Sequence, residues 1–270
     1  MAATDKLFAG SIPEIYDRFL VPLIFESYAD DLALRVADLN PQSILETAAG
    51  TGVLTRALTA RLPAHAHIVA TDLNQPMLDR AASRQLDDSR IAWRKADALR
   101  LPFDDNLFDV VTCQFGVMFF PDKIQGYREA RRVLKSGGRF LFNVWDQISK
   151  NEFADIITRA LATRFPQDPP CFLARTPHGY HDLQMIRDEL SAAGFASILV
   201  ETLDGAAGAR SPRDAAIAYC QGTPLRSEIE GRDPSRLEEA THEAADALAR
   251  RFGPGPIEGR IRAHVVTAAC

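Results

Sequence analysis

The stretch that decides the fold is residues 44–54, which read Ile-Leu-Glu-Thr-Ala-Ala-Gly-Thr-Gly-Val-Leu. It begins apolar, as the end of a buried parallel strand does, and then turns through small residues and glycines. From Val53 to Leu58, apolar residues recur at helical spacing. A strand that turns so tightly into a helix points backbone N–H groups at one spot, and Gly50 and Gly52 let a ligand approach them closely. The stretch therefore predicts a site for a nucleotide-like cofactor.

The identity of that cofactor depends on Glu46, at the end of the predicted strand. The dinucleotide fingerprint G-x-G-x-x-G needs a third glycine where this chain has Thr55. A carboxylate lies poorly beneath a pyrophosphate but suits a ligand with a cationic amino group. The pattern Glu-x-Ala-x-Gly-x-Gly, from Glu46 through Ala48 to Gly52, resembles motif I of the class I S-adenosylmethionine (SAM)-dependent methyltransferases. An ordinary glycine turn with a solvated glutamate is the simpler alternative.

A second acidic residue ends the next predicted strand, residues 68–72. The carboxylate of Asp72 can accept hydrogen bonds from both ribose hydroxyls of a nucleoside, whether the cofactor is NAD or SAM. Because Asp72 precedes Asn74-Gln75-Pro76, it could instead cap the following helix, and both roles can coexist. We expect Leu73 and Met77 to flank the adenosine.

The segment 95–103, Lys-Ala-Asp-Ala-Leu-Arg-Leu-Pro-Phe, is more specific. It resembles the segment of these methyltransferases in which an aspartate accepts the adenine amino group and the next backbone N–H binds a ring nitrogen. The resemblance assigns these roles to Asp97 and Ala98, and an ionised acceptor matches an amine donor. Gln114 and Phe115 follow the next predicted strand. The resemblance implies that they line the methionine arm of SAM and the mouth through which the methyl group leaves.

Four family-like segments in the expected order cover residues 41–146. The resemblance is to the broad small-molecule group that includes the ubiquinone/menaquinone-biosynthesis methyltransferases. It implies an α/β, Rossmann-like fold: a seven-stranded, mostly parallel sheet with helices on both faces and a last strand that runs antiparallel between the fifth and sixth. We expect a single domain of N-terminal helices over the cofactor (1–40), a SAM-binding core (41–149), insertions that cap the substrate (150–181 and 205–257) and a terminal strand (258–270).

Prolines and glycines predict element boundaries within this fold. Pro13 and Pro22 are expected to lie near the starts of two N-terminal helices. The glycines of the Leu-Lys-Ser-Gly-Gly turn, residues 134–138, are expected to end a helix and begin the fifth strand. In the resembled family an N-terminal aromatic residue often closes the cofactor site, and Tyr16 is the candidate here.

The composition excludes several classes of protein. A formal net charge of −5 argues against the basic face that nucleic-acid binding needs, and no apolar run is long enough to span a bilayer. No signal peptide is visible at the N-terminus. The four cysteines are far apart and form no C-x-x-C pair, which fits reduced thiols and a cytoplasmic location. We expect a monomer or a homodimer that acts on a small molecule.

Methyl transfer from SAM is an in-line displacement that leaves S-adenosylhomocysteine, and most of its catalysis can come from positioning. A base is needed only if the acceptor must lose a proton. His178, Tyr180 and His181 are candidates, although a histidine with a purely structural role is commoner. Nothing in the sequence suggests a metal site. Two alternatives stay open: an NAD(P)-binding Rossmann oxidoreductase, and a SAM-binding regulatory protein without catalysis.

Overall fold

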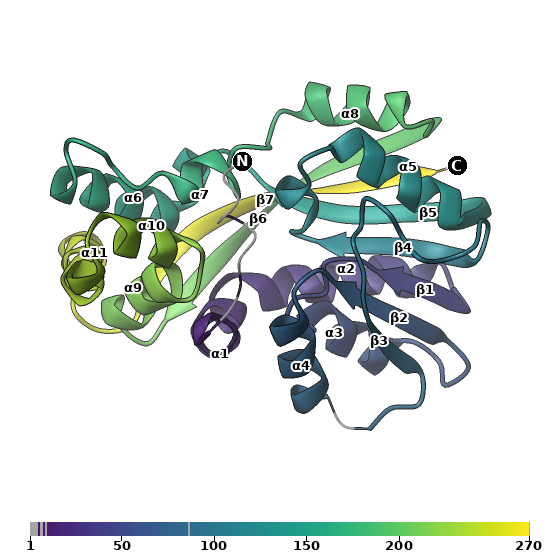
Figure 1. Ribbon diagram of the computed structural model, residues 1–270, viewed down its shortest axis with the longest axis horizontal. Helices are drawn as coiled ribbons and strands as arrows, with labels where there is room; N and C mark the ends of the chain where they lie inside the picture. Colours follow the sequence, from purple (N-terminus) through teal and green to yellow (C-terminus); the bar gives the residue numbers. More distant parts are fainter. Residues whose placement is uncertain (1–4, 6–7, 9, 86, 270) are drawn as a thin grey trace. The chain divides into compact units, whose positions relative to one another are not determined.

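The computed structural model describes residues 5, 8, 10–85 and 87–269. Within these residues, seven strands form one sheet in the order β3-β2-β1-β4-β5-β7-β6 (Figure 1). The strands are β1 (Ser43–Glu46), β2 (His67–Asp72), β3 (Ile91–Lys95), β4 (Phe108–Gln114), β5 (Leu134–Trp145), β6 (Ser197–Ala209) and β7 (Ile257–Ala269). The pairs among β1 to β5 are parallel. The last strand runs antiparallel between β5 and β6, so the predicted Rossmann-like fold is confirmed.

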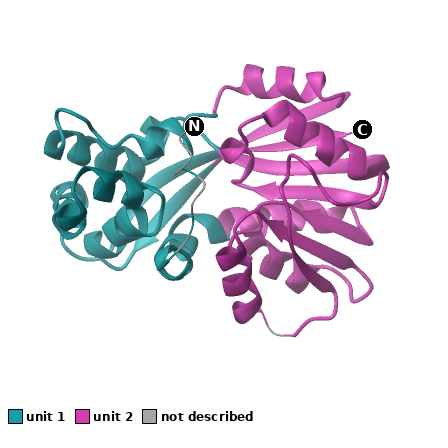
Figure 2. Ribbon diagram, in the orientation of Figure 1, with its two compact units in different colours: residues 1–26, 145–180, 204–263 teal, residues 27–144, 181–203, 264–270 magenta. Residues whose placement is uncertain are grey.

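The chain divides into two compact units (Figure 2). Unit 1 comprises residues 1–26, 145–180 and 204–263, and unit 2 comprises residues 27–144, 181–203 and 264–270. The helices of unit 2 are α2 (Glu26–Asp38, all but its first residue), α3 (Val53–Arg61), α4 (Gln75–Arg84), the 3-10 helix η3 (Val117–Phe119), α5 (Lys123–Val133) and α8 (Leu183–Ala192). Those of unit 1 are α1 (Ile12–Ile15), the π-helix η2 (Tyr16–Phe25), η4 (Ile148–Lys150), α6 (Glu152–Arg164), α7 (Phe172–Arg175), α9 (Pro212–Gln221), α10 (Leu225–Arg232), η5 (Pro234–Arg236) and α11 (Leu237–Phe252).

Helices cover both faces of the sheet in unit 2, because its strands are apolar on both sides. On one face, residues of α2 and α3 such as Leu32 and Leu58 pack against Ile44 of β1 in one buried cluster. On the other face, the Tyr127 ring of α5 contacts Phe140 of β5 at 5.8 Å between ring centroids. The helix faces that make these contacts carry the apolar residues that the sequence places at helical spacing.

Unit 1 is mainly helical. Its α11 packs on α6 and α9, and an ion pair between Arg164 and Glu239 joins α6 to α11. Residues 150–181 and 205–257, which the sequence marks as insertions, supply most of its helices. Among the described residues, we find no helix that is long and apolar enough to cross a membrane.

The prediction that a second N-terminal helix begins near Pro22 is wrong. Pro22 lies inside the π-helix η2, and the residues on either side of η2, Ile15 and Glu26, are also helical. The Glu26 N–H donates to the Val21 carbonyl, five residues back. A π-helical turn is wider than an α-helical turn, so it can accommodate a proline that lacks an N–H and would clash with the preceding turn.

The prediction that glycines end the helix before β5 is also wrong. Helix α5 ends at Val133, and Leu134 is already extended and pairs with Phe108 of β4. The register between β4 and β5 then shifts between Phe108 and Val110, and Gly137 has a φ of 77°. Gly137 therefore lies at an irregularity in the pairing of β4 with β5. The backbone there adopts a left-handed conformation, which glycine takes at little steric cost.

Candidate functional site

The loop after β1 contains three residues whose backbone conformation is left-handed. Ala48, Gly50 and Gly52 have φ values of 53°, 56° and 77°. Within the loop the Gly52 N–H donates to the Ala49 carbonyl at 2.9 Å, and the Ala49 N–H donates to the Thr71 carbonyl of β2 at 2.8 Å. The expected turn from strand to helix is present, and it is fixed to the neighbouring strand by its own backbone.

A second glycine outside the motif makes room for this loop. A Cβ at Gly116 would lie 2.5 Å from the Ala48 Cβ and 2.6 Å from the Cys113 Sγ, so a side chain there would displace the loop. Gly116 was not predicted from the sequence as a site residue. Its position two residues after the end of β4 was the available signal, because neighbouring parallel strands bring their following loops to the same edge.

Glu46 is buried at this turn, with 1% of its surface exposed. The Thr55 hydroxyl of α3 donates a hydrogen bond of 2.6 Å to Glu46 Oε2. Burial raises the pKa of Glu46 to about 8, and the nearby Asp72 acts in the same direction, while the Thr55 hydrogen bond and Arg56 favour the charged form. The simpler alternative of a solvated glutamate is therefore wrong, because this side chain is enclosed by protein.

Asp72 ties the end of β2 to the loop after β1. Its Oδ2 accepts a hydrogen bond of 2.9 Å from the Gly50 N–H, and its Oδ1 accepts one of 2.8 Å from the Asn74 N–H. Asn74 is the residue before helix α4 and makes no capping bond with its own side chain. Burial raises the pKa of Asp72 as well. Asp72 thus stabilises the start of α4, and each carboxylate oxygen retains capacity for a further hydrogen bond.

Two apolar residues predicted to flank a bound nucleoside follow Asp72. Leu73 is 43% exposed, which is unusual for a leucine beside a buried strand end, whereas Met77 is buried. The Met77 Cε lies 3.6 Å from the position that a Cβ on Gly50 would occupy. The structure therefore brings Met77 against the glycine loop and leaves Leu73 at the surface.

Asp97 and Ala98 follow β3, the next strand outward. The Ala96 N–H donates to the Asp72 carbonyl at 3.0 Å, which fixes the start of this segment beside the end of β2. Asp97 is exposed, and its Oδ1 accepts a hydrogen bond of 2.9 Å from the Leu99 N–H. Ala98 is half-buried. The two residues thus belong to the same sheet edge as Glu46 and Asp72.

Gln114 is the last residue of β4, Phe115 follows it, and both are buried. Phe115 has a φ of 49°, an unusual value for a bulky residue. Its N–H donates a hydrogen bond of 2.9 Å to Asn143 Oδ1, and its ring packs edge-on against Tyr28 at 5.5 Å. Asn143 was not predicted from the sequence, although a polar residue within the apolar run of β5 was an available signal.

Tyr16 lies in unit 1, on the π-helix η2. Its ring stacks on Phe25 at 5.4 Å between centroids and meets Phe8 edge-on at 5.9 Å. The structure therefore holds Tyr16 in an aromatic cluster of its own unit.

The three candidate bases do not all belong to one unit. His178 and Tyr180 are buried in unit 1, while His181 is half-buried in unit 2. The His178 Nδ1 lies 2.9 Å from the Asp146 carbonyl oxygen, and its ring lies 6.0 Å from that of Trp145. A carbonyl only accepts, so Nδ1 carries the proton and, in the neutral ring, Nε2 carries the lone pair of a base.

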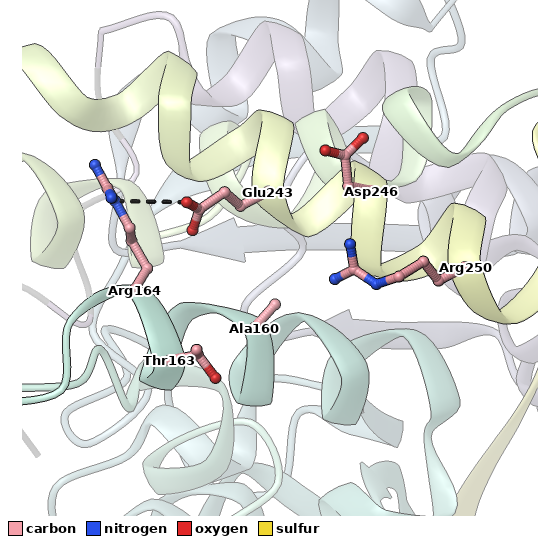
Figure 3. Close-up of a pocket in the computed structure, with 6 residues that line it drawn as sticks. All are labelled: Ala160, Thr163, Arg164, Glu243, Asp246 and Arg250. Atoms are coloured by element: carbon pink, nitrogen blue, oxygen red, sulfur yellow. Dashed lines mark ion pairs between the residues drawn. The ribbon is translucent and has the colours of Figure 1, made fainter.

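Unit 1 also contains a polar cavity of about 450 Å³ between α6 and α11 (Figure 3). An ion pair of 3.7 Å joins Arg164 to Glu243 on its rim. None of the predicted site residues is among those that line it, which are Ala160, Thr163, Arg164, Glu243, Asp246 and Arg250. In the part of the chain that the structure describes, no group of three or more His, Cys, Asp or Glu residues could hold a metal ion.

The chain is similar to known methyltransferases in sequence. The model of the ubiE/COQ5 methyltransferase family matches residues 16–160, just over half of the chain. A demethylmenaquinone methyltransferase from Clavibacter sepedonicus is 34% identical over 172 residues, which are 60% of this chain and 69% of the relative. The ubiquinone/menaquinone biosynthesis C-methyltransferase UbiE of Idiomarina loihiensis is 30% identical over 174 residues, again 60% of this chain and 69% of the relative.

Solved structures share the fold. The YcgJ protein from Bacillus subtilis has a TM-score of 0.56 at 19% identity, over 90% of this chain and 98% of the other. Phosphoethanolamine N-methyltransferase 2 of Haemonchus contortus, solved in complex with S-adenosyl-L-methionine, has a TM-score of 0.53 at 15% identity, over 97% of this chain and 60% of the other. The alternative of an NAD(P)-binding oxidoreductase is not favoured by these relatives.

Proposed function

The chain belongs to the ubiE/COQ5 methyltransferase family and is a SAM-dependent methyltransferase, and from this premise we propose that it methylates a small organic acceptor with SAM bound at the carboxyl ends of β1 to β4. The observation that carries the site is the pair of buried carboxyl groups, Glu46 and Asp72, at one glycine loop. Burying two carboxyl groups costs free energy, and a ligand with hydroxyl and ammonium donors offsets that cost.

We assign the parts of SAM to the residues that surround this loop. Glu46 receives the amino group of the methionine part, and Asp72 receives the two ribose hydroxyls. Asp97 and the Ala98 N–H hold the adenine, whose ring lies against Leu73 and Met77. The exposure of Leu73 supports this assignment, because an apolar side chain at the ligand edge gains from covering a ring. The small residues Ala48, Gly50 and Gly52 let the ligand reach the backbone.

Gln114 and Phe115 are proposed to line the path of the methyl group. The left-handed Phe115, held by Asn143, turns the chain sharply at the end of β4. Such strain is typical of sites where a side chain must be held in a set place. The aromatic ring of Phe115 can stabilise the positive sulfonium by cation–π contact.

The reaction itself needs little from the protein beyond geometry. The acceptor atom attacks the methyl carbon from the side opposite the sulfur, the carbon–sulfur bond breaks, and S-adenosylhomocysteine leaves with the electron pair. Holding the three atoms in line accounts for most of the rate. Where the acceptor must lose a proton, His178 is the strongest candidate base, because the Asp146 carbonyl fixes the tautomer in which Nε2 accepts. Tyr180 and His181 are weaker candidates.

We propose that residues 150–181 and 205–257 form the acceptor site. These segments follow strands and carry prolines and glycines among apolar residues, which is typical of segments that shape a binding site. A small acceptor, rather than nucleic acid, is supported by the net charge of −5. We also propose a cytoplasmic location and a monomeric or homodimeric state.

The experiment is a screen with SAM labelled on its methyl group. The enzyme is incubated with fractionated small-molecule extracts, with bulk tRNA and with a protein extract, and the label is followed into each pool. We expect transfer to a small-molecule fraction. Faster transfer to tRNA or protein would overturn the proposed acceptor class. Micromolar binding of NADH together with no binding of SAM, measured by calorimetry, would overturn the cofactor site as well.

A further inference from the structure

Thr55 stands where a dinucleotide-binding loop has its third glycine, and its side chain has a defined contact there. It lies on the first turn of α3 and is fully buried. Its hydroxyl donates a hydrogen bond of 2.6 Å to Glu46 Oε2, between two side chains that are both enclosed by protein. This distance lies within the range of a well-formed hydrogen bond from a hydroxyl to a carboxyl oxygen.

The other groups around Glu46 do not duplicate this contact. Arg56 of α3 favours its charged form, whereas Asp72 of β2 disfavours it. Cys113 of β4 is also buried, and burial raises the pKa of its thiol to about 12, with a smaller contribution in the same direction from Glu46 and Asp72. The Thr71 hydroxyl bonds the Glu46 backbone carbonyl rather than the carboxyl group.

Resting on the proposed site, we propose that Thr55 is a positioning residue for the cofactor: by holding Glu46 Oε2, it presents Oε1 to the amino group of SAM. The same bond favours the charged form of the carboxyl group that an ammonium requires. A glycine at this position could do neither. The residue that departs from the dinucleotide pattern is thus the one that adapts the loop to an amino-acid ligand.

The consequence is a dependence of SAM affinity on pH that changes when the hydroxyl is removed. Because burial raises the pKa of Glu46 to about 8, the free protein must release a proton to bind an ammonium at neutral pH. In Thr55→Val the carboxyl group loses the hydrogen bond that stabilises its charged form. Its pKa then rises further, and more of the free protein is in the wrong protonation state at low pH.

The test is calorimetry of SAM binding to wild type and Thr55→Val between pH 6.5 and pH 9. At each pH, the ratio of the two dissociation constants removes the titration of SAM itself. We expect the variant to bind about tenfold more weakly at pH 6.5, as for the loss of a hydrogen bond to a charged group. The ratio should fall several-fold by pH 9, where a much larger fraction of the carboxyl group is ionised in both proteins than at pH 6.5.

Three further variants separate this role from a structural one. Thr55→Ser keeps the hydroxyl and should restore the wild-type pH profile. Thr59→Val, on the same helix, removes a hydroxyl that bonds only the Arg56 carbonyl, and should change nothing. In a Glu46→Gln background, adding Thr55→Val should leave the pH profile unchanged, because no carboxyl group remains to titrate.

The outcomes are distinct. A Thr55→Val to wild-type ratio that stays constant with pH would show a structural role only and overturn the inference while leaving the cofactor site intact. Failure of the wild-type protein to bind SAM, or undiminished binding by Glu46→Gln, would instead overturn the proposed site. Circular dichroism and thermal melts establish that each variant is folded.

Discussion

The two units hold their candidate residues in different ways (Figure 2). In unit 2, backbone N–H groups and buried side chains fix Glu46, Asp72 and Phe115 at the ends of the neighbouring strands β1, β2 and β4. In unit 1, His178 contacts a backbone carbonyl group and an aromatic ring, and Tyr16 contacts two other aromatic rings. The cofactor site that we propose is therefore built from short sequence motifs, whereas unit 1, where we propose the acceptor site, is built by packing between helices.

If unit 2 binds SAM and unit 1 binds the acceptor, substitutions at the proposed site in unit 2 should change the affinity for SAM. Changes in unit 1 should leave that affinity unchanged.

The largest effect concerns Glu46 and the stability of the free protein. Its pKa is about 8 in the folded protein against an ordinary 4.5, so between pH 5 and pH 8 the unfolded chain loses a proton that the native state keeps. The contribution of Glu46 to the free energy of unfolding therefore falls by a few kcal/mol as pH rises through this window. Urea unfolding of wild type and Glu46→Gln at pH 5, 6.5 and 8 measures how the free energy of unfolding changes with pH. The fall in this free energy between pH 5 and pH 8 should be smaller in the variant. Equal slopes would contradict the burial of a neutral carboxyl group.

Asp72 comes second. Asp72→Ala should weaken SAM binding by about 1.5–3 kcal/mol, as for hydrogen bonds to a charged group, and this can be measured by calorimetry. The substitution also removes the bond to the Asn74 N–H before α4, so a control for lost helix stabilisation is needed.

Asp182→Ala supplies that control. Asp182 caps α8 through the Gln184 and Met185 N–H groups, and its loss should cost about 1 kcal/mol of stability without changing SAM affinity. Unchanged SAM affinity in a folded Asp72→Ala protein would leave only the structural role at α4.

Asp97 is expected to have a smaller effect because it is exposed. Asp97→Asn retains a carbonyl oxygen for the Leu99 N–H but reduces the attraction for the adenine amine. We expect a loss of about 0.5–1.5 kcal/mol in SAM affinity, the range for an ordinary hydrogen bond. A loss equal to that of Asp72→Ala would contradict the ranking of buried above exposed carboxyl groups.

The smallest effect on the cofactor end should come from unit 1. Replacing residues 150–181 and 205–257 with the corresponding segments of a relative should change which acceptor is methylated and leave the dissociation constant for SAM unchanged. Initial rates with two acceptors and calorimetry with SAM measure both quantities. An unchanged acceptor together with weakened SAM binding would reverse the assignment of the two units.

The sequence was sufficient to predict most of the fold. Strands that end in Glu46 and Asp72, and a last strand between the fifth and sixth, are as expected, because buried strands, glycine turns and acidic strand ends leave local patterns. The prediction that a helix begins near Pro22 failed because π-helical hydrogen bonding depends on packing rather than on local propensity. The prediction that Gly137 and Gly138 end the helix failed because the pairing of Leu134 with Phe108 ends the helix before them.

Within the site, the loop and its two carboxyl groups could be predicted, but their partners could not. Thr55 is recognisable as a departure from the glycine pattern, yet only the fold brings its hydroxyl to Glu46. Asn143 and Phe115 lie 28 residues apart in sequence, and only the pairing of β4 with β5 places them together. Which residues of the proposed acceptor site would contact the acceptor depends on side-chain packing that no short motif records.

The central claim is that SAM is held at the loop that joins β1 to α3, and hydrogen–deuterium exchange tests it most directly. Exchange is compared in the wild-type protein with and without saturating SAM. We predict slower exchange in peptides that contain residues 46–52, 72–77 and 97–98, and no comparable change in those from 212–252. Protection confined to unit 1, with the glycine loop unaffected, would contradict the account.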